Sequence, residues 1–151
     1  MRKLFIPNDT SAVAMGSNLV ANRFEELIKN KSLDIQIIRN GSRGMFWLEP
    51  LVEFESDFKR FGFQSVDLSE VESILEFICD DSFDAAFNKH PKFLGETENI
   101  EYFKKQQRLS FFRSGLGDPL CIDHYSSLEG FTGLKNCLLY TSDAADERNS
   151  G

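Results

Sequence analysis

The hydrophobic period of the chain changes twice within its first forty residues, and this change restricts it to an α/β fold. KLFIP (residues 3 to 7) is a short apolar run that suits a buried strand. Residues 9 to 11 then offer three N-cap candidates, and apolar residues, with Gly16 on the same face, recur at helical steps as far as Ile28. LDIQIIRN (33 to 40) alternates as a second strand. The order predicts a β-α-β unit with parallel strands and a right-handed connection.

A hairpin and a second helix follow the loop NGSRGMFWLEP (40 to 50). LVEFE alternates as a strand, SDFK makes a turn, and RFGFQSV returns as the partner strand. Ser69 and Glu72 have the spacing of a capping box, and a helical apolar face runs on to Ile78. The predicted order is β-α-β-β-α, or β-α-β-β-β-α if the loop carries a short strand. This is the layout of a thioredoxin-like fold, although other α/β sandwiches share it.

Residues 80 to 135 contain scattered turn residues and no long amphipathic face. We expect only short elements there: a helix at 97 to 106, a strand at 109 to 115 and a helix at 121 to 128. Segments of this kind usually pack along a neighbouring domain. The sequence therefore predicts a thioredoxin-like domain over 1–80 and an irregular connector over 81–136.

The charge and the apolar runs exclude some classes of protein. A net charge of −7 argues against a nucleic-acid-binding domain, which needs a surplus of Lys and Arg on one face. No apolar run approaches the roughly 20 residues of a membrane span. The apolar stretch in MRKLFIPND is too short for a signal peptide. These features predict a cytoplasmic protein.

The residues that could bind metals are few and widely spaced. Cys79, Cys121 and Cys137 form no CxxC pair, and His90 and His124 lie far apart in the sequence. The GSRG run at 41 to 44 leads to a proline rather than to a helix N-terminus, so a turn with positive φ is favoured over a phosphate loop. From the residues alone we predict no catalytic, cofactor-binding or metal-ligating residue.

Three stretches, SRGMFWLEPLVE, HPKFLG and YFKKQQRLSFFRSGLGDPLCIDHY, carry a resemblance over residues 1 to 135. They resemble the beginning of the NADH-oxidising flavoprotein (beta) subunit of soluble NAD-dependent formate dehydrogenases, a family related to the complex I flavoprotein subunit. The resemblance implies a parent that is an NAD-dependent oxidoreductase subunit with FMN, NAD and a [4Fe–4S] cluster. Its implied partners are a catalytic molybdenum or tungsten subunit and a small iron–sulfur subunit. The present chain lacks the FMN/NADH loop and the cluster cysteines, so we expect it to bind no cofactor.

The resemblance also gives an interpretation of the loop at 40 to 50. In related thioredoxin-like ferredoxins, cysteine pairs precede a Leu-x-Pro and follow the first strand. Setting Leu48-Glu49-Pro50 on that motif places Ser42 and Phe46 at one pair, and Pro7 and Ala12 at the other. None is a cysteine, so a [2Fe–2S] cluster has no thiolate ligands. The resemblance implies a loop that fills the cluster's space with Phe46 and Trp47 and serves packing and docking.

The carboxyl end departs from the family. CLLYTSDAADE resembles the translation of a sequencing adapter, so residues 137–151 are predicted not to belong to the natural protein. Without a flavin domain to pack on, the connector is expected to expose four rings, those of Phe103, Phe111, Phe112 and Phe131.

Three other functions are considered. The parent could be a complex I flavoprotein subunit or the flavoprotein subunit of an NAD-reducing hydrogenase. The chain could instead be a stand-alone, non-catalytic thioredoxin-like adaptor. A thiol oxidoreductase is disfavoured, because it needs a CxxC motif or an activated lone thiol.

Overall fold

The structure is a computed structural model that describes residues 2–80 and 90–147, with side chains described as far as residue 140. It divides into two compact units, Met1–Gly117 and Asp118–Gly151. The described part of the second unit, residues 118–147, contains two helices, α5 (Ile122–Ser127) and α6 (Thr132–Glu147). No helix in the described ranges combines the length and apolar character needed to cross a membrane.

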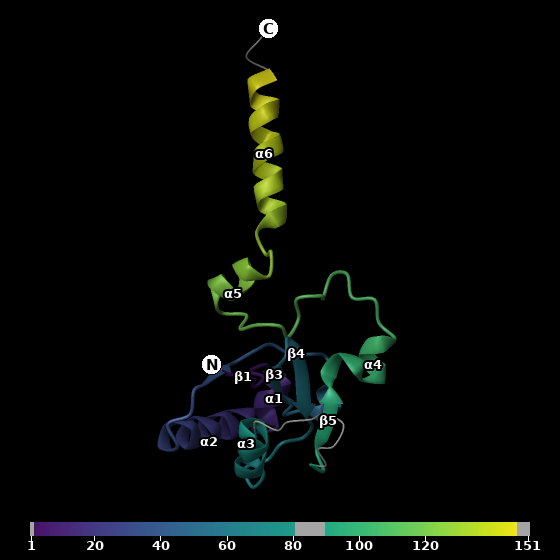
Figure 1. The fold of residues 1–151 in the computed structure, drawn as a ribbon. Helices are drawn as coiled ribbons and strands as arrows, with labels where there is room; N and C mark the ends of the chain where they lie inside the picture. The colour runs from purple at the N-terminus through teal and green to yellow at the C-terminus, as the bar shows by residue number, and fades with distance from the viewer. Residues whose placement is uncertain (1, 81–89, 148–151) are drawn as a thin grey trace. The chain divides into compact units, whose positions relative to one another are not determined.

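The first unit is built on one mixed sheet of five strands in the order β2-β1-β3-β4-β5 (Figure 1). Strands β1 and β2 are parallel, and every other neighbouring pair is antiparallel. The strands are β1 (Arg2–Phe5), β2 (Ile35–Ile38), β3 (Val52–Ser56), β4 (Lys59–Phe63) and β5 (Phe93–Glu96).

The helices of this unit complete the predicted α/β, thioredoxin-like layout. Residues 39–51, all of them described, hold a 3₁₀ helix and no strand, so the order is β-α-β-β-α before β5. The parallel β-α-β unit and the hairpin are confirmed. The helices are α1 (Thr10–Ala14), α2 (Ser17–Asn30), α3 (Val71–Cys79), α4 (Glu101–Lys104) and two 3₁₀ helices (Phe46–Leu48 and Thr97–Asn99).

The first helical region begins as predicted but is broken. The Asp9 carboxylate accepts hydrogen bonds from the backbone N–H groups of Ser11 (3.0 Å) and Ala12 (3.3 Å), which confirms the N-cap. The prediction of one continuous helix is wrong, because Gly16 has a φ of 96° and separates α1 from α2. Only glycine adopts this conformation at little cost, so the chain changes direction there.

The start of α3 also differs from the prediction. Its N-cap residue is Glu70, and no side chain caps the helix. The hydroxyl of Ser69 instead donates to Asp67 at 2.5 Å, within the preceding turn. The predicted capping box is therefore wrong, because a local side-chain bond competes for the hydroxyl.

The main core lies between the sheet and the helix pair α2 and α3, which pack against each other (Figure 1). Val52 and Phe54 on β3 face this core. A second, smaller core contains Met45, Leu48, Leu51 and Phe103. Since successive strand residues point to opposite faces, Leu51 and Glu53 belong to the other face of the sheet. Both faces of β3 are thus covered.

Residues 90–117 belong to the first unit. Strand β5 pairs with β4, and the chain runs on through α4. The helix predicted at 97 to 106 is reduced to a 3₁₀ turn and α4, and the strand predicted at 109 to 115 is wrong because those residues form turns. Their carbonyl groups bind a side chain instead of a strand: Arg60 donates to the carbonyl oxygens of Gly115 and Leu116. The helix predicted at 121 to 128 is confirmed as α5.

Phe58 lies in the two-residue turn between β3 and β4 and offers a test of backbone strain. Asp57 and Phe58 have φ values of 49° and 62°, and the Phe58 side chain is fully exposed. Phe58→Gly is expected to raise the free energy of unfolding by about 1 kcal/mol, because glycine adopts positive φ without a Cβ clash. Urea unfolding measures the change. Phe58→Ala is the control, since it removes the ring and keeps the Cβ; equal gains in both variants would contradict the explanation.

Candidate functional site: the loop between β2 and β3

The candidate site is the loop of residues 39–50, which follows β2 and ends at the cis peptide bond Glu49–Pro50 before β3. The backbone N–H of Asn8 donates to the carbonyl of Asn40 at 2.9 Å. The Arg39 guanidinium donates to the carbonyl oxygens of Ile6 and Pro7, each at 3.2 Å. The loops that follow the two parallel strands are therefore fastened to each other.

The glycine-rich part of the loop is a turn, as predicted. Gly44 has a φ of 82°, and its backbone N–H donates to the Ser42 hydroxyl at 3.0 Å. The Ser42 carbonyl accepts a hydrogen bond from the hydroxyl of Ser114 at 2.9 Å. The loop is thus tied to a segment some seventy residues later in the chain.

Two guanidinium groups, one buried and one half-buried, hold one buried carboxylate beneath the loop. Glu53 is fully buried, with Arg43 Nε 3.6 Å from one of its oxygens and Arg60 Nη1 3.6 Å from the other. Arg43, whose side chain is 1% exposed, also pairs with Glu98, and its guanidinium lies 4.8 Å from the Phe103 ring centre. Burial lowers the pKa of Arg60, opposed by the attraction of Glu53. Such partners offset the cost of burying a carboxylate.

Glu49 is a second buried carboxyl group in the loop, and its environment is different. Burial raises its pKa to about 7, with further repulsion from Asp9 and Glu53, while the Leu51 N–H, at 2.8 Å, opposes the rise. The second carboxyl oxygen of Glu49 has no hydrogen-bond partner among the described residues. The side chain therefore exchanges its proton near neutral pH.

The aromatic residues of the loop do not fill its interior. Met45 and Leu48 are buried, whereas Phe46 and Trp47 are 58% and 61% exposed. The 3₁₀ helix explains this, because side chains three residues apart share a face. The interpretation that Phe46 and Trp47 occupy the cluster's space is wrong. Trp47 instead stands edge-on to Tyr102 with ring centres 5.0 Å apart.

The four positions matched to cluster cysteines have unlike surroundings. Pro7 and Ala12 are buried, Ser42 is half-buried with its hydroxyl used in the turn, and Phe46 is exposed. With no thiolate among them, these residues do not fit a thiolate-held cluster. Across the described ranges, no group of three or more His, Cys, Asp or Glu residues is placed to hold a metal ion.

Of the four rings expected on the surface of the connector, two are clearly exposed. Phe111 and Phe112 are 73% and 45% exposed, which confirms the prediction for them. Phe131 is half-buried, with its ring centre 4.9 Å from that of Tyr125. The prediction is wrong for Phe103, which is buried because the guanidinium groups of Arg43 and Arg108 lie over its ring.

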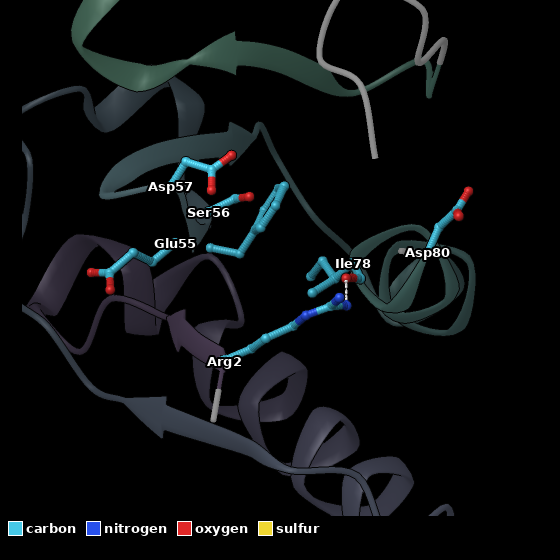
Figure 2. Close-up of a pocket in the computed structure, with 7 residues that line it drawn as sticks. Arg2, Glu55, Ser56, Asp57, Ile78 and Asp80 are labelled. Carbon is cyan, nitrogen blue, oxygen red and sulfur yellow. Dashed lines mark hydrogen bonds between the residues drawn. The ribbon is translucent and has the colours of Figure 1, made fainter. Parts of the chain in front are cut away.

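A cavity of about 220 Å³ lies at the other end of β3 and is shown in Figure 2. Arg2 reaches across it from β1 and donates to the carbonyl of Ile78 at the end of α3. The carboxylates of Glu55, Asp57 and Asp80 point in different directions and do not converge on one point (Figure 2). The cavity therefore lacks the geometry of a cation site.

Similarity to known proteins is found among solved structures. No protein-family model and no curated protein sequence matches the chain. A thioredoxin-like [2Fe-2S] ferredoxin from Aquifex aeolicus aligns with a TM-score of 0.49 at 14% identity, over 64% of this chain and 93% of that chain. The wild-type form of such a ferredoxin from the same organism gives 0.44 at 20% identity, over 50% of this chain and 82% of the other. The assignment of a thioredoxin-like fold rests on the sheet topology described above.

Proposed function

We propose that the chain is the N-terminal part of an NADH-oxidising or NAD-reducing electron-transfer subunit of a soluble, cytoplasmic formate dehydrogenase. In this proposal it acts as scaffold and docking surface. Three sequence stretches that resemble that family support the proposal. The thioredoxin-like sheet supports it too, because the positions matched to the cluster cysteines carry no thiolate. Two of these stretches, SRGMFWLEPLVE and YFKKQQRLSFFRSGLGDPLCIDHY, supply the candidate loop and the segment fastened to it by Ser114.

The observation that carries the docking role is the contrast within the loop. Arg43, Met45 and Leu48 are buried and fix its base, while Phe46 and Trp47 face outward. Aromatic side chains on a rigid base lose little entropy on binding and often dominate interface energies. The loop therefore suits protein contact better than chemistry.

The proposal assigns the cofactors to the rest of the parent subunit. FMN, NAD and the [4Fe–4S] cluster would be bound by segments other than this chain, and formate would be oxidised on a molybdenum or tungsten subunit. The docking partners would be that subunit or a small iron–sulfur subunit. If the parent were instead a complex I or hydrogenase flavoprotein subunit, this chain would be the same kind of scaffold with other partners.

Sequencing the source DNA through and beyond the codon for Lys135 tests the parent. The proposal expects an open frame that continues into a glycine-rich flavin loop and a cysteine cluster. A frame that stops, or that truly encodes CLLYTSDAADE, would overturn it and leave a stand-alone adaptor.

Trp47→Ala tests the docking role in the complete complex. Because an exposed aromatic anchor contributes to binding rather than to folding, the variant should weaken assembly at least about tenfold. The free energy of unfolding should change by less than about 0.5 kcal/mol. Leu19→Ala on α2 is the matched control, since Leu19 is 60% exposed and Trp47 61%. Assembly is measured by analytical ultracentrifugation; equal effects of the two variants would refute the assignment.

A further inference from the structure

A cavity of about 290 Å³ opens between the candidate loop and the segment that follows α4. It is distinct from the cavity in Figure 2, which lies at the turn end of β3. Its volume is near the lower end of the range for small-molecule sites, about 300–1,000 Å³. Its lining combines cationic, amide and aromatic side chains and includes Arg43, Arg108, Gln106, Phe46, Tyr102 and Phe111.

Beneath the cavity lies a group of charged side chains that includes one unpartnered donor. The ion pairs there join three guanidinium groups, on Arg43, Arg60 and Arg108, to two carboxylates, on Glu53 and Glu98. Arg43 Nη1 is buried and has no hydrogen-bond partner within the described residues. Buried polar groups are normally hydrogen-bonded, so this Arg43 donor lacks an acceptor.

The two cations of the lining are held in place before any ligand arrives. The guanidinium carbons of Arg43 and Arg108 lie 4.8 Å and 4.3 Å from the centre of the same ring, that of Phe103. Glu98 pairs with both side chains from a position outside the lining. Fixed guanidinium groups lose little freedom on binding an anion, which favours affinity.

We propose that this cavity binds a small anion carried on a single aromatic ring, such as an arylacetate. The anionic group pairs with Arg108 and supplies the acceptor that Arg43 lacks, as guanidinium groups prefer. The ring packs among Phe46, Tyr102 and Phe111. No carboxylate lines the cavity, so nothing in the lining repels the anion. This site does not depend on the proposed function.

Isothermal titration of the full chain with phenylacetate tests the proposal. Phenylacetamide is the probe without charge, and acetate is the probe without a ring. We expect saturable binding of phenylacetate, and binding at least about tenfold weaker for each of the other two, because a charge-assisted bond and ring burial are each lost.

Two pairs of variants locate the site. Arg108→Gln and Phe111→Ala should each weaken phenylacetate binding about tenfold or more. Arg113→Gln and Phe112→Ala are the matched controls, because Arg113 lies over the Phe112 ring and neither residue lines the cavity. Circular dichroism checks that each variant folds, and Arg43 is left intact because it is buried. Absence of phenylacetate binding, equal binding of the amide or of acetate, or equal losses in the controls would each overturn the proposal.

Discussion

Replacing Glu53 with glutamine is expected to lower the free energy of unfolding by about 3–5 kcal/mol, the usual cost of breaking a buried ion pair by removing one partner. Glu53 is fully buried, and Arg43 and Arg60 each approach one of its oxygens to 3.6 Å. Glutamine keeps the size of the side chain but leaves both cations without this counter-charge. Urea unfolding followed by circular dichroism measures the loss.

The control is Glu55→Gln, two residues further along the same strand. Glu55 pairs with Lys3 at 3.3 Å, but its side chain is 34% exposed, so water replaces the lost partner. Exposed pairs contribute at most about 1 kcal/mol, and the control variant should lose no more than that. Similar losses at the two positions would show that burying the ion pairs of Glu53 contributes no more to the free energy of unfolding than an exposed pair does.

The parts of the fold that follow from local pattern were predictable from the sequence. The Asp9 cap and the hairpin before Val66 depend on residues within a few positions of one another. The β-α-β unit pairs residues as far apart as Arg2 and Ile35, but the hydrophobic period of each of its elements is local. The sequence pattern places Gly16 inside one continuous helix, because a glycine on a helical face does not disturb the hydrophobic period. Only its φ of 96° reveals the break.

The burial of Glu53 and Arg43 could not be predicted from the sequence, because the side chains that bury them are distant in the chain. The alternation in LVEFE places Glu53 and Glu55 on the same face of the strand and does not separate them. Glu55 is 34% exposed, whereas Arg43 and Phe103 close over the same face at Glu53. A run of turn residues such as GSRG gives no sign that its arginine is buried.

The packing of the loop at 40 to 50 differs from the interpretation made from the sequence. Sequence composition treats Met45, Phe46, Trp47 and Leu48 as one apolar run. The 3₁₀ helix divides the run, with Met45 and Leu48 inside and the two rings outside. The cavity beside Phe46 depends on Arg108 and Phe111, which lie some sixty residues away and enter through tertiary contact alone.

Glu49→Gln is expected to stabilise the protein relative to the parent, and increasingly so as pH rises. The pKa of Glu49 is about 7 in the folded chain, above the ordinary value of 4.5, because burial disfavours the charged form. Well below pH 4.5 the group is protonated in both the folded and the unfolded state. Between that pH and about 7 the unfolded chain loses its proton first, so the parent loses stability as pH rises.

Glutamine never ionises, and its carbonyl oxygen can still accept the 2.8 Å hydrogen bond from the Leu51 N–H. The difference in free energy of unfolding between variant and parent should therefore grow by about 3 kcal/mol from pH 4 to pH 8. Urea unfolding of both proteins at a series of pH values measures it, with Glu55→Gln as the control for loss of an exposed carboxylate. A difference that stays constant across the series would mean that Glu49 is ionised inside the fold at no cost. The repulsion from the Asp9 and Glu53 carboxylates, which raises its pKa, would then have to be offset by the attraction of a cation.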